Sequence, residues 1–155
     1  MDEFYLNRAL ALAAASVPRG EGGPFGAVVV REGEIIGEAW NQVVASRDPT
    51  AHAEVLAIRA ACARIDHFHL DGCVLYASSE PCPLCLAAAY WARIARIVYA
   101  NPRAAAAAAG FCDHDLYEEF RAPPEARRLP VQHLALPDAA APFAAWTRLA
   151  QRKLY

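Results

Sequence analysis

The stretch Ser79-Glu80-Pro81-Cys82-Pro83-Leu84-Cys85 decides how this chain is expected to fold. Cysteines three residues apart fall on one face of a helical turn, so both thiols can reach a single metal ion. The two prolines are typical of a helix start, where a missing backbone N–H costs nothing. The thiols would then lie near the positive end of a helix dipole, which favours the thiolate that a metal ion needs.

A second motif, Asp48-Pro49-Thr50-Ala51-His52-Ala53-Glu54, supplies further candidate ligands upstream. His52 would be the third protein ligand, and the fourth zinc position would stay open for water, as in catalytic rather than structural zinc sites. Glu54 would act as a base beside that water, and His-x-Glu followed by Pro-Cys-x-x-Cys is the signature of zinc deaminases. Because residues two apart on a helix point to different sides, His52 and Glu54 can converge only if the metal lies off the first helical turn.

Other interpretations of the cysteine pair are weaker. Redox pairs and structural zinc sites share the Cys-x-x-Cys spacing, so this pair alone is a weak signal. A structural site would need a fourth ligand, for which the chain offers Cys62, Cys73, Cys112, His67 and His69. These residues form neither a second Cys-x-x-Cys nor a histidine pair at zinc-finger spacing, and buried inert thiols are common in apolar segments. The two motifs together therefore favour a catalytic zinc site.

Length and composition bound the remaining possibilities. The chain has 155 residues, of which 56% are hydrophobic and 21% charged, so we expect one globular domain spanning 1–155. A net charge of −2 gives no basic field for nucleic acid, and no segment approaches the ~20 apolar residues of a membrane span. Five cysteines, an odd number, without a secretory leader indicate a reducing cytoplasm and metal binding rather than disulfides.

Helical and strand patterns alternate along the chain. We expect helices over 4–16, 51–64, 81–92, 103–109, 116–121 and 138–153, with Thr50 as the N-cap of the second. We expect strands over 25–30 and 35–40, paired as a hairpin, and over 73–78, 96–100 and 131–136. The pattern predicts a layered α/β fold with a mixed sheet, because the hairpin is antiparallel. Asn41 follows the second strand, where it is either a turn residue or a ligand for a heteroaromatic base, since its amide carries both donor and acceptor.

Four segments resemble bacterial guanine deaminases of the cytidine-deaminase fold. They are Gly23-Pro24-Phe25-Gly26-Ala27-Val28, the two motifs that carry His52 and Cys82, and Tyr90-Trp91-Ala92-Arg93. The likeness covers essentially the whole chain, including Gly110-Phe111-x-Asp113 and the terminal Lys153-Leu154-Tyr155. The first three segments are shared with tRNA adenosine deaminases, whereas the Trp91 run, the Asp113 loop and the final tyrosine point to guanine. Cys112 stands where a second acidic residue is expected.

The resemblance implies a three-layer α/β/α fold with a five-stranded mixed sheet and one Zn²⁺ per chain. The implied zinc ligands are His52, Cys82 and Cys85, and the implied proton carriers are Glu54 and Asp113. The implied purine contacts are stacking by Phe25 and Trp91, a hydrogen bond from Asn41, and Asp113 with Tyr155 around the amino group and ring edge. Without the resemblance, Phe25 and Trp91 could equally be core residues, Asp113 an exposed loop acid and Tyr155 a frayed terminus.

The implied reaction is hydrolysis of guanine to xanthine and ammonia. The resemblance also implies a homodimer in which an arm of residues 137–155 crosses to the partner's active site, and composition adds the expectation of a cytoplasmic protein without membrane attachment. A tRNA-specific adenosine deaminase is the alternative, but it needs a basic anticodon-binding face, and the basic groups at 127–128 and 148–153 are small. Guanosine or an aminotriazine remains an alternative substrate. A zinc-stabilised module without catalysis would not need Glu54.

Overall fold

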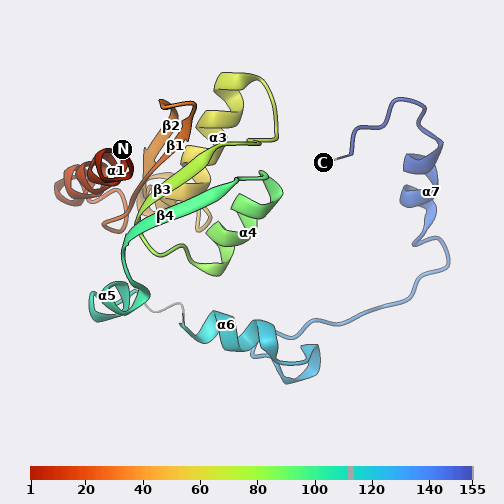
Figure 1. Cartoon of the computed structure of the whole chain (residues 1–155). Coiled ribbons are helices and arrows are strands. Elements are labelled where there is room, and N and C mark those ends of the chain that lie inside the picture. Colours follow the sequence, from red (N-terminus) through yellow and green to blue (C-terminus); the bar gives the residue numbers. More distant parts are fainter. Residues whose placement is uncertain (112–113, 155) are drawn as a thin grey trace. The chain divides into compact units, whose positions relative to one another are not determined.

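A computed structural model describes residues 1–111 and 114–154 of the chain (Figure 1). The backbone divides into two compact units, one up to residue 113 and one from residue 114, and each is described by itself. Among the described residues, no helix combines the length and the apolar character that crossing a bilayer requires.

A four-stranded mixed sheet forms the centre of the first unit. It consists of β1 (Gly26–Arg31), β2 (Glu34–Trp40), β3 (Val74–Ser79) and β4 (Arg96–Asn101), in the order β2-β1-β3-β4. The predicted hairpin forms, and β1 runs antiparallel to both of its neighbours, whereas β4 runs parallel to β3. The helix between β3 and β4 supplies the crossover that a parallel pair needs.

Helices cover both faces of this sheet. On one face lies α1 (Asp2–Ser16), which continues into the 3₁₀ turn η1 (Val17–Arg19). On the other face lie α3 (Ala53–Ile65) and α4 (Pro83–Trp91), while α2 (Val43–Ser46) and α5 (Arg103–Ala108) are short and follow β2 and β4 in the chain (Figure 1). The predicted α/β/α layering is therefore confirmed for the first unit.

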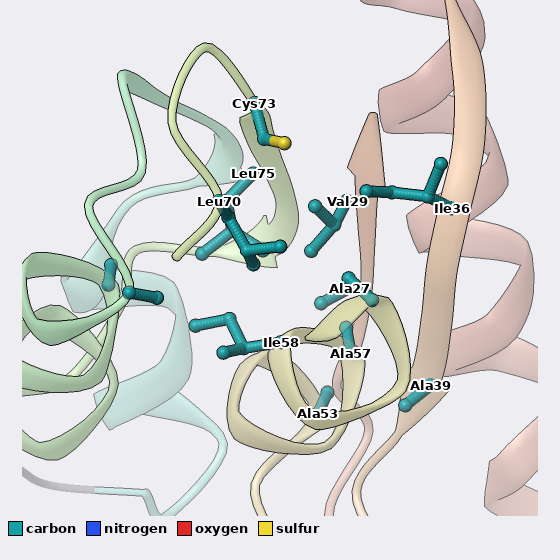
Figure 2. Close-up of a cluster of buried hydrophobic side chains, with 13 residues drawn as sticks. Ala27, Val29, Ile36, Ala39, Ala53, Ala57, Ile58, Leu70, Cys73 and Leu75 are labelled. Carbon is teal, nitrogen blue, oxygen red and sulfur yellow. The ribbon is translucent and has the colours of Figure 1, made fainter. Parts of the chain in front are cut away.

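Alternation along the strands builds a core on each side of the sheet. Ala27 and Val29 of β1 face the α3 layer together with Leu75, and Figure 2 shows Ile58 of α3 facing this cluster. The intervening residues Val28 and Val30 pack towards α1. On β2, a Cβ atom at Gly37 would lie 2.4 Å from the carbonyl oxygen of Ala57, so only glycine lets α3 lie directly on the strand.

The prediction of a fifth strand was wrong. Residues 131–136 are irregular, and the apolar side chains at 131, 134 and 136 are exposed. Apolar alternation alone does not make a strand, because a strand is stabilised by pairing with a neighbour.

Helix boundaries also differ from prediction: the other helices shift by one or two residues at an end, and the last helix shifts most. The second helix begins at Ala53 with His52 as its N-cap, not at residue 51 with Thr50 as the cap. The reason is a turn before the helix, in which the Asp48 carboxylate accepts hydrogen bonds from the backbone N–H and the hydroxyl of Thr50.

The second unit contains α6 (His114–Arg121), the 3₁₀ turn η2 (Pro124–Ala126) and α7 (Ala141–Arg148). The last helix is thus shorter than the predicted 138–153.

Strand register gathers several segments at one end of the sheet. Gly26 pairs with Trp40, Ala27 with Ala77, and Ser79 with Asn101. The chain immediately before β1, after β2, after β3 and after β4 therefore emerges at the same end. Phe25, Asn41, the cysteine loop and the start of α5 are brought together there.

Candidate active site

The three predicted metal ligands meet where the N-termini of α3 and α4 converge. His52 is the N-cap of α3, Cys82 is the N-cap of α4 with Pro83 at the first helical position, and Cys85 follows one turn later. Their ligand atoms form a compact triangle, with the sulfurs 3.6 Å apart and His52 Nδ1 lying 3.5 Å from Cys82 Sγ and 3.4 Å from Cys85 Sγ.

This triangle fits a zinc ion. With Zn–S bonds of about 2.3 Å and Zn–N bonds of about 2.1 Å, tetrahedral geometry places two sulfurs about 3.8 Å apart and a sulfur and a nitrogen about 3.6 Å apart. The observed separations lie close to those values. Three ligands of this kind leave a fourth position for water or substrate, which is the arrangement of catalytic zinc sites.

The electrostatics of the triangle favour a thiolate. The hydrogen bond shared with Cys85, followed by the bond to His52, lowers the pKa of Cys82 to about 4. The same contact with Cys82, together with burial, raises the pKa of Cys85, so one proton between the two sulfurs stays on Cys85. Hydrogen bonding to Cys82 also raises the pKa of His52. Binding of a metal ion at this triangle would release the remaining proton.

Glu54 lies in the first turn of α3 and lines the same cavity as His52 and Cys82. Its side chain is buried, and this burial raises the pKa of its carboxyl. Because His52 precedes the helix and Glu54 is inside it, the two side chains can converge although they are only two residues apart. The geometric requirement inferred from the sequence is therefore met.

A cavity of about 430 Å³ opens above these residues, within the size range of small-molecule sites. It is lined by Gly23, Phe25, Asn41, Val43, Val44, Pro49, His52, Glu54, Ser79, Glu80, Cys82, Arg103, Ala106 and Phe111. The ring of Phe25 meets that of Phe111 edge to face with 4.9 Å between centroids, so an aromatic wall stands beside the polar groups.

Asn41 is fixed in one orientation. It is 6% exposed, and its Oδ1 accepts hydrogen bonds from the backbone N–H groups of Gly23 and Val43, both at 3.2 Å. These two donors require the amide oxygen at that position, which leaves the NH₂ group as the end that Asn41 can offer a ligand. Asn41 therefore presents a hydrogen-bond donor, and not an acceptor, to a ligand in the cavity.

Glu80 and Arg103 form a part of the wall that the sequence did not reveal. Arg103 Nη2 donates to Glu80 Oε1 at 2.6 Å, and the Arg103 backbone N–H donates to Glu80 Oε2 at 3.0 Å. The Glu80 backbone N–H in turn donates to the carbonyl of Asn101 at 2.8 Å. This pair attaches the start of α5 to the loop that precedes Cys82. The only signal in the sequence is that Glu80 and Arg103 each come shortly after the end of a strand, β3 and β4 respectively.

The remaining predicted site residues are Trp91, Asp113 and Tyr155. Trp91 is the last residue of α4, is 66% exposed and is not among the lining residues. Asp113, Cys112 and Tyr155 lie outside the described residues.

Comparisons with known proteins agree with this site. Residues 1–101 match the family described as the cytidine and deoxycytidylate deaminase zinc-binding region. Guanine deaminase of Bacillus subtilis is 49% identical over 99% of this chain and 98% of its own length. The X-ray structure of guanine deaminase from that organism superposes with a TM-score of 0.96 over 99% of this chain and 98% of its own.

Two more distant relatives match less of the chain. A tRNA-specific adenosine deaminase of Aquifex aeolicus is 45% identical over 63% of this chain and 64% of its own. A solved guanine deaminase of Nitrosomonas europaea is 34% identical over 70% of this chain and 63% of its own, with a TM-score of 0.66.

Proposed function

Because the chain belongs to the family that carries the cytidine and deoxycytidylate deaminase zinc-binding region, we propose that it is a zinc-dependent guanine deaminase. It hydrolyses guanine to xanthine and ammonia, a reaction of purine catabolism or salvage. The observation that carries this function is one cavity that holds His52, Cys82 and Glu54 together with the donor group of Asn41.

The share of the chain that each relative matches favours guanine over a tRNA as the substrate. Guanine deaminase of Bacillus subtilis matches nearly the whole chain, whereas the tRNA-specific adenosine deaminase of Aquifex aeolicus matches 63% of it. The chemistry of the zinc site is shared by both classes, so the residues beyond this shared part carry the difference in substrate.

His52, Cys82 and Cys85 hold the metal, and we propose one zinc ion per chain. When bound, zinc lowers the pKa of water to about 7 and so supplies a nucleophile near neutral pH. Glu54 accepts the proton of the attacking water and passes it to the ring nitrogen next to C2 of guanine. A C2–O bond forms and the C2–N bond to the 2-amino group breaks. Glu54, with Asp113, then takes the proton of the new C2 hydroxyl and delivers it to the departing amine, so that ammonia leaves as the C2 carbonyl forms.

Recognition of guanine follows from the donor group of Asn41. Guanine carries acceptors at O6 and N7, on the edge opposite its 2-amino group. The amide NH₂ of Asn41 donates to one of these acceptors, and Phe25 packs against the ring. We also propose that Trp91 stacks on the purine, and that Asp113 and Tyr155 contact the 2-amino group and the ring edge.

The working unit that we propose is a cytoplasmic homodimer. The arm at 137–155 crosses to the partner and places its terminal aromatic residue at the partner's active site. Prolines at 137 and 142 support a stiff hinge at the start of this arm.

Release of ammonia from guanine, guanosine, adenine, cytosine, an aminotriazine and a tRNA substrate tests the assignment. We expect guanine to be deaminated at least ~10⁴-fold better than adenine, because the wrong base leaves buried polar groups unpaired. Conversion of tRNA adenosine to inosine without activity on guanine would overturn it.

A further inference from the structure

The orientation of Asn41 depends on the glycine loop at 20–24. The Gly23 N–H is one of the two donors that hold Asn41 Oδ1, so movement of this loop would release the amide. A Cβ atom at Gly22 would lie 2.1 Å from Asn41 Oδ1, which shows how closely the loop backbone passes the amide. Glycine-rich segments lose much conformational entropy when they are ordered, so this loop needs an anchor.

Glu21 is that anchor. It is the one residue of the loop with a polar side chain, and its carboxylate accepts a hydrogen bond from Trp40 Nε1. Its carbonyl oxygen accepts from the backbone N–H groups of Val44 and Ala45, each at 3.0 Å. Glu21 is therefore bonded both to the residue that precedes Asn41 and to the first turn of α2, which follows it.

Arg19 approaches Trp40 from the other end of the loop. Its guanidinium carbon lies 5.0 Å from the centre of the Trp40 ring, within the range of a cation–π interaction. Trp40 is thus held by residues on both sides of Gly20. Glu21, Trp40 and Arg19 do not line the cavity, so they can act on a ligand only through the groups that do.

We propose that Glu21 and Trp40 are positioning residues for substrate binding, which fix the glycine loop so that Asn41 presents its NH₂ group to the purine. The proposal rests on the function proposed above. Loss of the anchor frees the loop, and Asn41 then spends part of its time with its donor turned away from the ligand. The reduction in guanine affinity follows from the lower population of the binding-competent state.

Steady-state kinetics of the zinc-loaded full chain test this role. Glu21→Ala should raise KM for guanine about tenfold with a much smaller change in kcat, as expected when binding common to ground and transition states is lost. Glu21→Gln retains a carbonyl acceptor for the indole N–H and should restore most of the affinity. Trp40→Phe keeps the ring but lacks the donor, so it should resemble Glu21→Ala.

A matched control uses the same hairpin. Glu38 lies on β2 close to Trp40 in the chain, pairs with Arg8 at 2.5 Å and is not among the residues that line the cavity. Glu38→Ala should leave KM unchanged, and zinc content should be the same in all variants.

Double variants separate positioning from a general loss of stability. If Glu21 acts through Asn41, Glu21→Ala should raise KM little further in an Asn41→Ala background. Additive effects, or a KM of Glu21→Ala and Trp40→Phe equal to that of the wild type, overturn the inference. Failure of the wild-type protein to release ammonia from guanine overturns the proposed function instead.

Discussion

At the scale of single residues, the surroundings of a cavity side chain restrict it to one hydrogen-bonding or proton-transfer role. An asparagine amide can donate and accept, but Asn41 has its oxygen held by two backbone N–H groups and keeps only its donor for a ligand. A glutamate at the surface is ionised at neutral pH, whereas burial raises the pKa of Glu54 and suits it to carry a proton.

Replacement of Glu54 by glutamine tests its role as proton carrier. Glu54→Gln keeps the shape of the side chain but cannot accept a proton, so kcat should fall by about 10²–10⁴-fold. Zinc content, measured by elemental analysis, should equal that of the wild type, because the proposed ligands are His52, Cys82 and Cys85. Full activity of a zinc-replete variant would contradict the assignment, and loss of the metal would make Glu54 a ligand.

Asn41→Asp tests the direction of the hydrogen bond to the purine. The two backbone N–H groups that hold Oδ1 would stabilise the aspartate as a carboxylate, so its second oxygen would present an acceptor in place of the NH₂ donor. We expect the selectivity for guanine over adenine, measured as a ratio of kcat/KM values, to fall by ~10²-fold or more. An unchanged ratio would show that the amide does not donate to O6, the acceptor that adenine lacks.

At the scale of elements, two helix N-termini form the candidate metal centre, and segments that follow or precede strand ends form much of the cavity wall. The first could be predicted from sequence, because the spacing of His52 and Glu54 and the spacing of Cys82 and Cys85 are local, and each pair lies at the start of a helix. The contact between Glu80 and Arg103 could not be predicted, because it depends on the register of β3 against β4. The prediction of a fifth strand failed for the same reason, because the pairing of one strand with another is not determined by the local sequence.

Trp91, Asp113 and Tyr155 show a different limit of the sequence. Their assignment came from resemblance alone; Trp91 does not line the cavity, and Asp113 and Tyr155 lie outside the described residues. His52, Cys82 and Cys85 come together, and the first two line one cavity with Glu54, Asn41 and Phe25, but the roles of all these residues stay predictions.

The attachment of α1 to the sheet gives a prediction on pH. The Arg96 guanidinium donates a hydrogen bond to each carboxylate oxygen of Asp2 at 2.9 Å, and the Tyr76 hydroxyl donates to Asp2 Oδ1 at 2.6 Å. These hydrogen bonds lower the pKa of Asp2 to about 2. Because the folded-state pKa lies below the unfolded value, the stabilisation is present above about pH 4 and lost as the pH falls towards 2. Thermal unfolding should show a lower midpoint for Asp2→Asn at pH 7, and the gap from wild type should close below pH ~2–3. A gap that persists there would point to another cause.

At the scale of the whole molecule, the two units differ in how they bury apolar groups. The first unit has continuous cores on both faces of its sheet. The second exposes large apolar side chains, among them Leu129, Val131, Leu134, Leu136, Phe143 and Leu154. Chains that act alone seldom leave so much apolar surface uncovered, which supports a partner for this segment. A second copy of the chain is the occupant that we propose.

Removal of Leu154 and Tyr155 tests whether the end of the arm serves the active site. If the terminal aromatic residue closes a site, the truncated chain should lose most of its turnover of guanine. Its zinc content should not change, because the metal ligands all lie in the first unit. A fully active truncated chain, or a fully active monomer at the assay concentration, would contradict the exchange of arms.

Complementation between two inactive chains then decides whether the arm acts on its own chain or on the partner. One chain carries Glu54→Gln with an intact arm, and the other carries Glu54 but lacks residues 154–155. If the arms cross, each mixed dimer contains one site with both Glu54 and an arm; random pairing makes about half of the dimers mixed, so about a quarter of wild-type activity should return. If each arm serves its own chain, no site in the mixture has both parts and activity should stay at the level of the separate variants. Co-expression with two affinity tags, followed by isolation of the doubly tagged dimer, makes the measurement independent of the pairing ratio.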